Sequence, residues 1–140
     1  MEWEAAACGL PRRAWLGLGR PKPRLYPWGG RFEPGRCNSF ESHLRRTTPV
    51  GVFPGGDNPA GLADLAGNVF EWTGSLHQPY PYDSQDGREN LESMDGRRVA
   101  RGGSWDGSLD YARAAYRDRR SPGSRSFNLG FRVLCVAPIP

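Results

Sequence analysis

The residues best suited to redox or metal chemistry are three cysteines and two histidines, and they stand far apart. Cys8, Cys37 and Cys135 form no CxxC pair, and no histidine lies at zinc-ligand spacing from them. His43 and His77 stand in loop-like stretches and cannot assemble an iron site of two histidines and a carboxylate. The sequence therefore predicts neither a zinc knuckle nor a redox dithiol. It leaves open one disulfide or free thiols.

A second set of residues has the composition of a binding surface. The segment 106–128 is rich in Tyr, Ser, Gly, Asp and Arg. Tyr supplies a large contact area at low entropic cost, and small polar side chains adapt to different ligands. If the segment binds a ligand, its larger side chains should share one exposed face. These side chains are Asp106, Tyr111, Tyr116, Arg119 and Phe127.

Few regular elements are expected to position these residues, because Gly and Pro are abundant and helix formers are scarce. Residues 2–8 favour a helix, since three consecutive alanines stand there and Gly9-Leu10-Pro11 ends it. Three short strands are expected, at residues 47–54, 98–101 and 130–136. The last strand should be buried together with its cysteine.

The length and charge of the chain limit its function class. Its 140 residues suit one domain with a modest core. The formal net charge of +4 comes almost wholly from Arg, a bias that points to a GC-rich, bacterial genome. These arginines are scattered among Gly, Ser and acidic residues, which favours structural pairing, so no nucleic-acid partner is expected. No apolar run is long enough for a membrane and no secretory signal is visible, so we expect no membrane partner and a cytoplasmic location by default.

Four short signatures stand in order along the chain. They are Tyr26-Pro27-Trp28-Gly29, then Thr48-Pro49-Val50-Gly51, then Gly67-Asn68-Val69-Phe70-Glu71-Trp72, and finally Arg101-Gly102-Gly103-Ser104-Trp105 with Leu129-Gly130-Phe131-Arg132. Together they resemble the formylglycine-generating enzyme, or sulfatase-modifying factor, family. The resemblance implies an α+β, C-type-lectin-like fold of that family's type, loop-rich with short strands and little helix.

The resemblance also divides the chain. Residues 1–23 resemble the end of the family's helix followed by a Gly/Pro/Arg-rich loop, and residues 24–137 resemble the C-terminal part of the family domain. The N-terminal part of that domain is therefore expected to be absent from this chain. Without that part of the domain, apolar edges of the remaining part are expected to be exposed.

A structural calcium ion is implied by the same resemblance. Family members hold it with two side-chain oxygens and two carbonyls, and the matching positions here are Asp64, Gly67, Val69 and Glu71. Hard oxygen ligands and a tight, glycine-containing backbone suit calcium. The alternative is that Asp64 and Glu71 cap loops or pair with arginines.

The family's oxidase activity requires two cysteines, five residues apart, that bind copper(I). Counting back from Leu129-Gly130-Phe131-Arg132, the matching positions here are Leu109 and Ala114, so neither copper nor catalysis is expected. The sequence predicts a non-catalytic domain that binds a protein or small-molecule ligand. The alternative is an oxidase that converts a sulfatase cysteine to formylglycine, or a fragment of one.

Variable proteins of diversity-generating retroelements also resemble this family, and they vary mainly at asparagine codons before a terminal Gly-Phe-Arg strand. Changing the adenines of such codons never yields Lys, Glu, Gln, Met or Trp, and none of these stands in residues 106–128. The alternative is an unspecialised non-catalytic family member. The candidate ligand-binding residues are Asp106, Gly107, Ser108, Asp110, Tyr111, Tyr116, Asp118, Arg119, Arg120, Ser121, Ser124, Ser126, Phe127 and Asn128.

Overall fold

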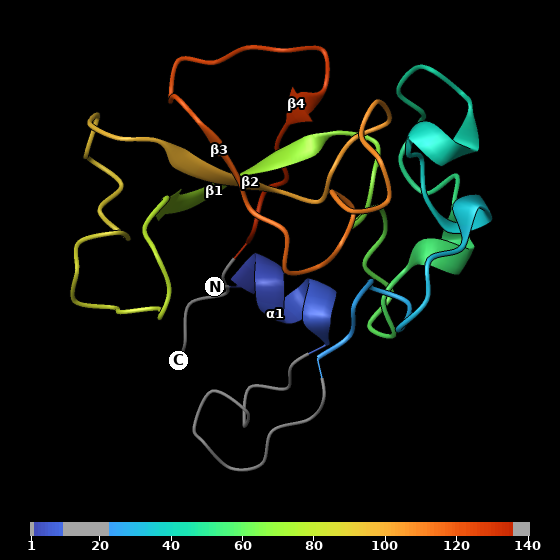
Figure 1. Ribbon diagram of the computed structural model, residues 1–140, viewed down its shortest axis with the longest axis horizontal. Helices are drawn as coiled ribbons and strands as arrows, with labels where there is room; N and C mark the ends of the chain where they lie inside the picture. Colours follow the sequence, from blue (N-terminus) through green and yellow to red (C-terminus); the bar gives the residue numbers. More distant parts are fainter. Residues whose placement is uncertain (1, 10–22, 136–140) are drawn as a thin grey trace.

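A small four-stranded sheet lies at the centre of the computed structural model, which describes residues 2–9 and 23–135 (Figure 1). The strand order is β3-β2-β1-β4, with β4 parallel to β1 and the other neighbours antiparallel. The strands are β1 (Phe70–Leu76), β2 (Arg98–Arg101), β3 (Asp118–Arg120) and β4 (Leu129–Gly130). The helices are α1 (Glu2–Cys8) and the short 3₁₀ helices η2 (Pro34–Arg36), η3 (Phe40–Ser42) and η4 (Pro54–Gly56). The expected class of fold, with short strands and little helix, is confirmed, and so is the strand at residues 98–101.

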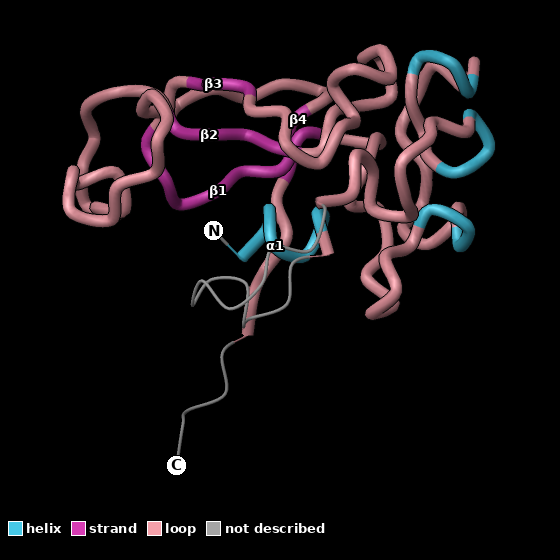
Figure 2. The backbone as a smooth tube through the Cα atoms, turned by 60° about the horizontal axis from the view of Figure 1, so that its bottom comes forward, coloured by secondary structure: helices cyan, strands magenta, loops and turns pink. Residues whose placement is uncertain are grey.

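Helix α1 packs beneath the sheet, as Figures 1 and 2 both show. The indole N–H of Trp3 donates to Glu71 Oε2 at 2.6 Å, and the carboxylate of Glu4 pairs with the guanidinium of Arg101. Further along the helix, Ala7 and Cys8 are buried in a small core cluster. The expected helix at residues 2–8 is confirmed, and polar contacts from its first turn fasten it to β1 and β2.

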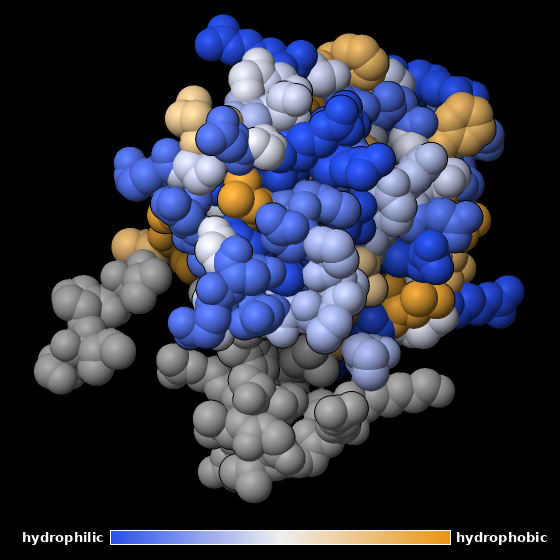
Figure 3. Space-filling view, turned by 60° about the vertical axis from the view of Figure 1, so that its left-hand side comes forward, coloured by the Kyte–Doolittle hydropathy of each residue, from blue (hydrophilic) through white to orange (hydrophobic). Residues whose placement is uncertain are grey.

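Arginines hold the long loop 77–97 at one end of the sheet. The buried guanidinium of Arg88 contacts Asp86 at 2.6 Å and also donates to two proline carbonyls. Arg98 donates to three loop carbonyls, those of Asn90, Leu91 and Ser93. The face on this side of the molecule is mostly hydrophilic, with apolar side chains only scattered over it (Figure 3). The predicted structural role of arginines is confirmed here.

A second core cluster contains no strand residue and includes Cys37, which stands between η2 and η3. Tyr26, Cys37, Ala66 and Ala112 are buried there, with Trp28 stacked on Tyr26 at 5.3 Å between ring centroids.

The cluster is closed by a tight backbone contact. Gly67 has a φ of +77°, and a Cβ at this position would overlap the carbonyl oxygen of Asn38. Asn38 is fully buried, and its amide donates to the carbonyl of Arg46 at 2.8 Å. Close backbone approach and amide hydrogen bonds thus replace sheet pairing in this half of the molecule.

Two expected strands are wrong. Residues 47–54 form no strand, because the Asn68 side chain rather than a neighbouring strand bonds the backbone N–H of Thr48, at 3.0 Å. Residues 130–136 are not a buried strand either: pairing with β1 ends at Gly130, and the residues that follow leave the sheet. Phe131, Val133, Leu134 and Cys135 are exposed, and Val136 lies outside the described residues.

All three cysteines are free thiols, which decides between the two alternatives left by the sequence. Burial raises the pKa of Cys37 to about 11, although a hydrogen bond with Ser39 opposes the shift. Burial also raises the pKa of Cys8, and the nearby carboxylate of Glu4 adds to that effect. Cys135 is exposed. The buried thiols are therefore held in their unreactive, protonated form.

Thiol labelling of the folded chain at pH 8 is expected to modify Cys135 quickly and to leave Cys8 and Cys37 intact until denaturant is added. Only the thiolate reacts, and with a pKa near 11 about a thousandth of Cys37 is ionised at pH 8. Mass spectrometry after brief exposure to Ellman's reagent measures this. Cys135→Ser should remove the fast reaction. Equally fast labelling of Cys37 would contradict the described core.

Candidate ligand-binding pocket

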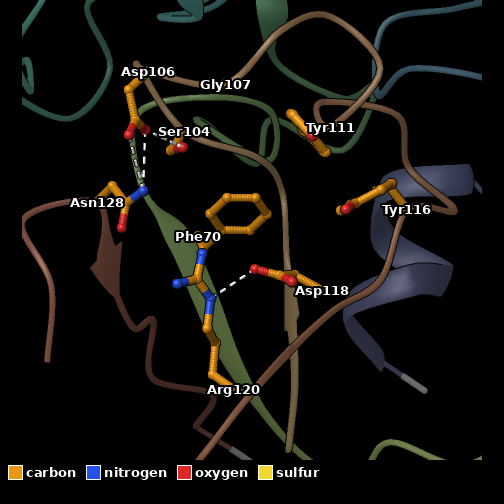
Figure 4. A pocket seen from close by; sticks show the side chains of 9 residues that line it. All are labelled: Phe70, Ser104, Asp106, Gly107, Tyr111, Tyr116, Asp118, Arg120 and Asn128. Carbon is orange, nitrogen blue, oxygen red and sulfur yellow. Dashed lines mark hydrogen bonds and ion pairs between the residues drawn. The ribbon is translucent and has the colours of Figure 1, made fainter. Parts of the chain in front are cut away.

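A cavity of about 280 Å³ opens above the start of β1, between the sheet and the loops that follow β2 and β3 (Figure 4). The residues that line it come from four separate stretches of the chain. They are Phe70, Ser104, Asp106, Gly107, Tyr111, Tyr116, Asp118, Arg120 and Asn128.

Strand alternation decides which side chains reach the cavity. Successive residues of a strand point to opposite faces. Phe70 therefore forms the floor of the cavity, while Glu71 points to the face covered by α1, where Trp3 contacts it. The same rule applies on β3, where Asp118 and Arg120 line the cavity.

The loop after β2 is held by backbone crowding and by carboxylate hydrogen bonds. Gly103 has a φ of +74°, and a Cβ there would lie 2.9 Å from the backbone nitrogen of Ala112. Further along, the carboxylate of Glu41 accepts from the backbone N–H of Leu109 at 2.9 Å and from Ser39. Burial opposes ionisation of Glu41, but these two hydrogen bonds, together with its own backbone N–H and the nearby His43, outweigh burial and lower its pKa. The loop thus has a charged anchor outside the cavity.

A hydrogen-bonded carboxylate forms one wall. Asp106 accepts from the hydroxyl of Ser104 at 2.6 Å and from the amide of Asn128 at 3.1 Å. Asn128 directly precedes β4, so this contact joins the loop after β2 to the loop before β4. Each of the partners of Asp106 is neutral.

The opposite wall is aromatic. The rings of Tyr111 and Tyr116 meet edge to face with centroids 4.9 Å apart, and each lies 6.4 Å from the ring of Phe70. Burial, followed by the nearby carboxylate of Asp118, raises the pKa of Tyr116, so its phenol stays protonated and can donate a hydrogen bond.

An ion pair closes the lower end of the cavity. Arg120 contacts Asp118 at 2.7 Å, and its guanidinium carbon lies 5.5 Å from the ring centroid of Phe70. Figure 4 shows this pair on one side of the Phe70 ring, away from Asp106.

The cavity gathers half of the candidate ligand-binding residues. Those that line it are Asp106, Gly107, Tyr111, Tyr116, Asp118, Arg120 and Asn128. Those that do not are Ser108, Asp110, Arg119, Ser121, Ser124, Ser126 and Phe127.

Of the five side chains expected to share one exposed face, three line the cavity and two do not. Arg119 is exposed but stands between Asp118 and Arg120 on β3, so strand alternation directs it to the opposite face. Phe127 packs on Trp105 at 5.6 Å beside the cavity and is 71% exposed. The single-face expectation is therefore wrong for Arg119, because a β-strand runs through that part of the segment.

Sequence reasoning missed Phe70 and Ser104 as cavity residues. Both stand in signature motifs that we interpreted as elements of the fold. The available signal was the alternation of side chains along the strand. Phe70 and Glu71 are neighbours, so Phe70 must point to the face of the sheet opposite to the one that holds the Glu71 carboxylate.

The positions expected to carry the oxidase cysteines lie outside the cavity lining. Ala114 is fully buried in the cluster with Ala7 and Cys8, and the carbonyl of Leu109 accepts from the hydroxyl of Tyr26. Residues 101–132 contain no cysteine. Aligning the family motif one or more positions earlier or later in this segment therefore does not place a cysteine at either catalytic position.

Comparisons with known proteins give the same fold and family. The chain matches the Sulfatase-modifying factor enzyme 1-like domain over residues 1–137. It is 38% identical over 154 residues to the Inactive C-alpha-formylglycine-generating enzyme 2 of Mus musculus, and 37% identical over 134 residues to the Serine/threonine-protein kinase pkn1 of Chlamydia caviae. The solved structure of Treponema denticola variable protein 1 superposes with a TM-score of 0.65 at 29% identity. The expected C-type-lectin-like fold of the formylglycine-generating enzyme type is confirmed.

The chain spans less than half of each of these relatives. The matches cover 99%, 94% and 93% of this chain, but 42% of the mouse protein, 19% of the chlamydial protein and 43% of the variable protein. Within residues 2–9 and 23–135, no helix is long and apolar enough to cross a membrane.

The residues expected to bind calcium have other partners in the structure. Both oxygens of Glu71 accept from Arg132, at 2.6 and 2.7 Å, and the carbonyls of Ala63 and Asp64 accept from the same guanidinium. The carboxylate of Asp64 accepts from the backbone N–H of Gly51 at 2.7 Å. The structure thus shows the arrangement that the sequence left as the alternative to calcium binding, in which Asp64 caps a loop and Glu71 pairs with an arginine.

Of the four expected calcium ligands, Arg132 occupies only Glu71, so an ion bound there would have to displace the guanidinium from that carboxylate. Elsewhere in the described part of the chain, no group of three or more His, Cys, Asp or Glu side chains could hold a metal ion. The calcium ligand set of Asp64, Gly67, Val69 and Glu71 stays a prediction.

The contact of Arg132 with Glu71 predicts that millimolar calcium leaves the melting temperature of the parent chain unchanged relative to EDTA, whereas the calcium ligand set predicts a rise. In Arg132→Met, where the carboxylate loses that partner, calcium should raise the melting temperature and magnesium should not. Thermal unfolding with each ion measures this. A calcium-dependent rise in the parent that disappears in Glu71→Gln would instead establish the ion site.

Proposed function

Because the chain belongs to the sulfatase-modifying factor enzyme 1-like family, we propose that it is a non-catalytic domain that binds a protein or small-molecule ligand in this pocket. The observation that carries the proposal is the lining itself. Three aromatic rings, a carboxylate with neutral partners and an ion pair converge on one concave site, a mixture typical of ligand pockets.

Several observations support the absence of the family's oxidase chemistry. A thiol pair is needed to bind copper(I), and no cysteine or histidine lines the pocket. Cys8 and Cys37 lie in the core with raised pKa values. The mouse relative, at 38% identity, is itself called inactive. The formylglycine-generating oxidase remains the alternative, and incubation with a cysteine-containing sulfatase peptide should give no aldehyde product.

A more specific version is a variable protein of a diversity-generating retroelement. The likeness to Treponema denticola variable protein 1 favours it, together with the residue types present in 106–128. The pocket limits how freely some positions could vary. A Cβ at Gly107 would lie 3.1 Å from the ring of Tyr111, whereas Asp106 and Tyr111 are exposed and have room for replacement.

Peptides selected from a random library on the immobilised chain are expected to bind through the pocket. Tyr111→Ser should weaken the binding of the selected peptides at least about tenfold, because a partly exposed aromatic ring provides contact area that serine lacks. Isothermal titration of synthetic peptides with the parent and the variant measures the change.

The matched control is Arg119→Ser, a substitution of another large exposed side chain in the same segment that does not line the pocket. It should leave the affinity unchanged. Equal losses in both variants, or no loss in Tyr111→Ser, would contradict binding at this site.

A further inference from the structure

We infer that the pocket takes the cationic side chain of a peptide or protein partner, an inference that rests on the proposed binding function. The carboxylate of Asp118 is paired with Arg120, whereas Asp106 has only neutral partners, Ser104 and Asn128. In the part of the chain that the structure describes, no cationic side chain forms an ion pair with Asp106. The lining therefore carries a net negative charge.

The aromatic lining favours the same sign of charge. Faces of aromatic rings attract cations, most strongly where water is partly excluded. Figure 4 shows Asp106 on one side of the Phe70 ring and Tyr111 and Tyr116 on the other. Phe70 is only 5% exposed, so a cation above it would meet a carboxylate, phenol oxygens and a partly desolvated ring.

The pocket already holds one cation in this way. Arg120 lies against the ring of Phe70 and is paired with a carboxylate. The half of the pocket beside Asp106 offers the same combination of a ring and a carboxylate, without a resident guanidinium.

An anionic ligand would have to break contacts that a cation leaves intact. An anion would have to pair with Arg120, whose guanidinium contacts the carboxylate of Asp118 at 2.7 Å. Drawing the guanidinium away would leave the Asp118 carboxylate without its cation. The anion would also be repelled by Asp106. A cation is therefore the better complement.

The rim of the pocket favours a side chain on a peptide over a free amine. Phe127 is 71% exposed and packs on Trp105, directly beside the Asp106–Asn128 contact. Tyr111 is 41% exposed on the other side. Exposed aromatic rings around a pocket provide contact area for the residues that flank an inserted side chain.

Three blocked tripeptides that differ only in their central residue test the inference. Lysine provides the cation, norleucine removes the charge and keeps the apolar stem, and glutamate reverses the charge. In ¹H–¹⁵N NMR titrations of the parent chain, the lysine peptide is expected to bind about tenfold more tightly than the norleucine peptide and to shift the signals of Ser104 and Asp106. The glutamate peptide should bind more weakly than both.

Asp106→Asn keeps the shape of the side chain and removes its charge, so it should abolish the preference for lysine over norleucine. Arg119→Gln, which also changes the net charge of the chain by a single unit, should keep the preference. Dispersed amide signals check that each variant is folded, and the comparison of peptides on the parent chain does not depend on either variant.

The inference is overturned if the norleucine or glutamate peptide binds as tightly as the lysine peptide, if none shifts the pocket signals, or if the preference survives in Asp106→Asn. If butylammonium binds as tightly as the lysine peptide, the pocket takes a free amine, and the inference that the cation belongs to a peptide or protein is overturned. The proposed binding function is judged separately. If selected peptides lose affinity in Tyr111→Ser but carry no cationic residue, that function stands and the cation inference fails.

Discussion

The half-buried ion pair between Glu71 and Arg132 positions the two parts of the molecule on which the pocket depends. Arg132 grips both carboxylate oxygens of Glu71, at 2.6 and 2.7 Å, and thereby fastens the end of β4 beside the start of β1. Because Glu71 is held on the lower face of the sheet, Phe70 must point to the upper face and form the pocket floor. Because β4 is held in register with β1, Asn128 stands where it reaches Asp106. Removing Arg132 leaves the buried carboxylate of Glu71 without its cation; because the Arg132 side chain is 35% exposed, the cost falls below the roughly 3 kcal/mol of a fully buried pair.

Side-chain contacts take the place of secondary structure throughout this loop-rich fold. Arg101 pairs with Glu4 of α1 and donates to the carbonyl of Tyr116, so the helix beneath the sheet supports the aromatic wall above it. Glu41 anchors the loop of Asp106 through the backbone of Leu109. These contacts satisfy backbone groups that in a larger sheet would be paired with strands.

The sequence alone predicted the family, the helix at residues 2–8, the strand at 98–101 and the segment that contributes most of the pocket, because ordered motifs and alanine runs are local signals. It failed where the outcome depends on a distant partner. Residues 47–54 have strand-forming composition, yet the amide of Asn68 rather than a strand satisfies Thr48. The arginine partner of Glu71 could not be predicted either, because no local pattern shows that Arg132, 61 residues further on, contacts its carboxylate; the calcium ligand set itself stays a prediction. The place of the buried Phe70 at the floor of the pocket also depends on distant parts of the chain, because it is set by the direction of β1 and by the loops around it.

The most direct test of the account is a crystal structure of the full chain bound to a peptide selected on it. The account predicts that one peptide side chain lies over Phe70, between Asp106 and the tyrosine pair, while the Glu71–Arg132 contact stays intact. A peptide seated instead on the exposed apolar residues after β4, with the cavity beside Asp106 unchanged, would contradict the assignment of this pocket as the binding site.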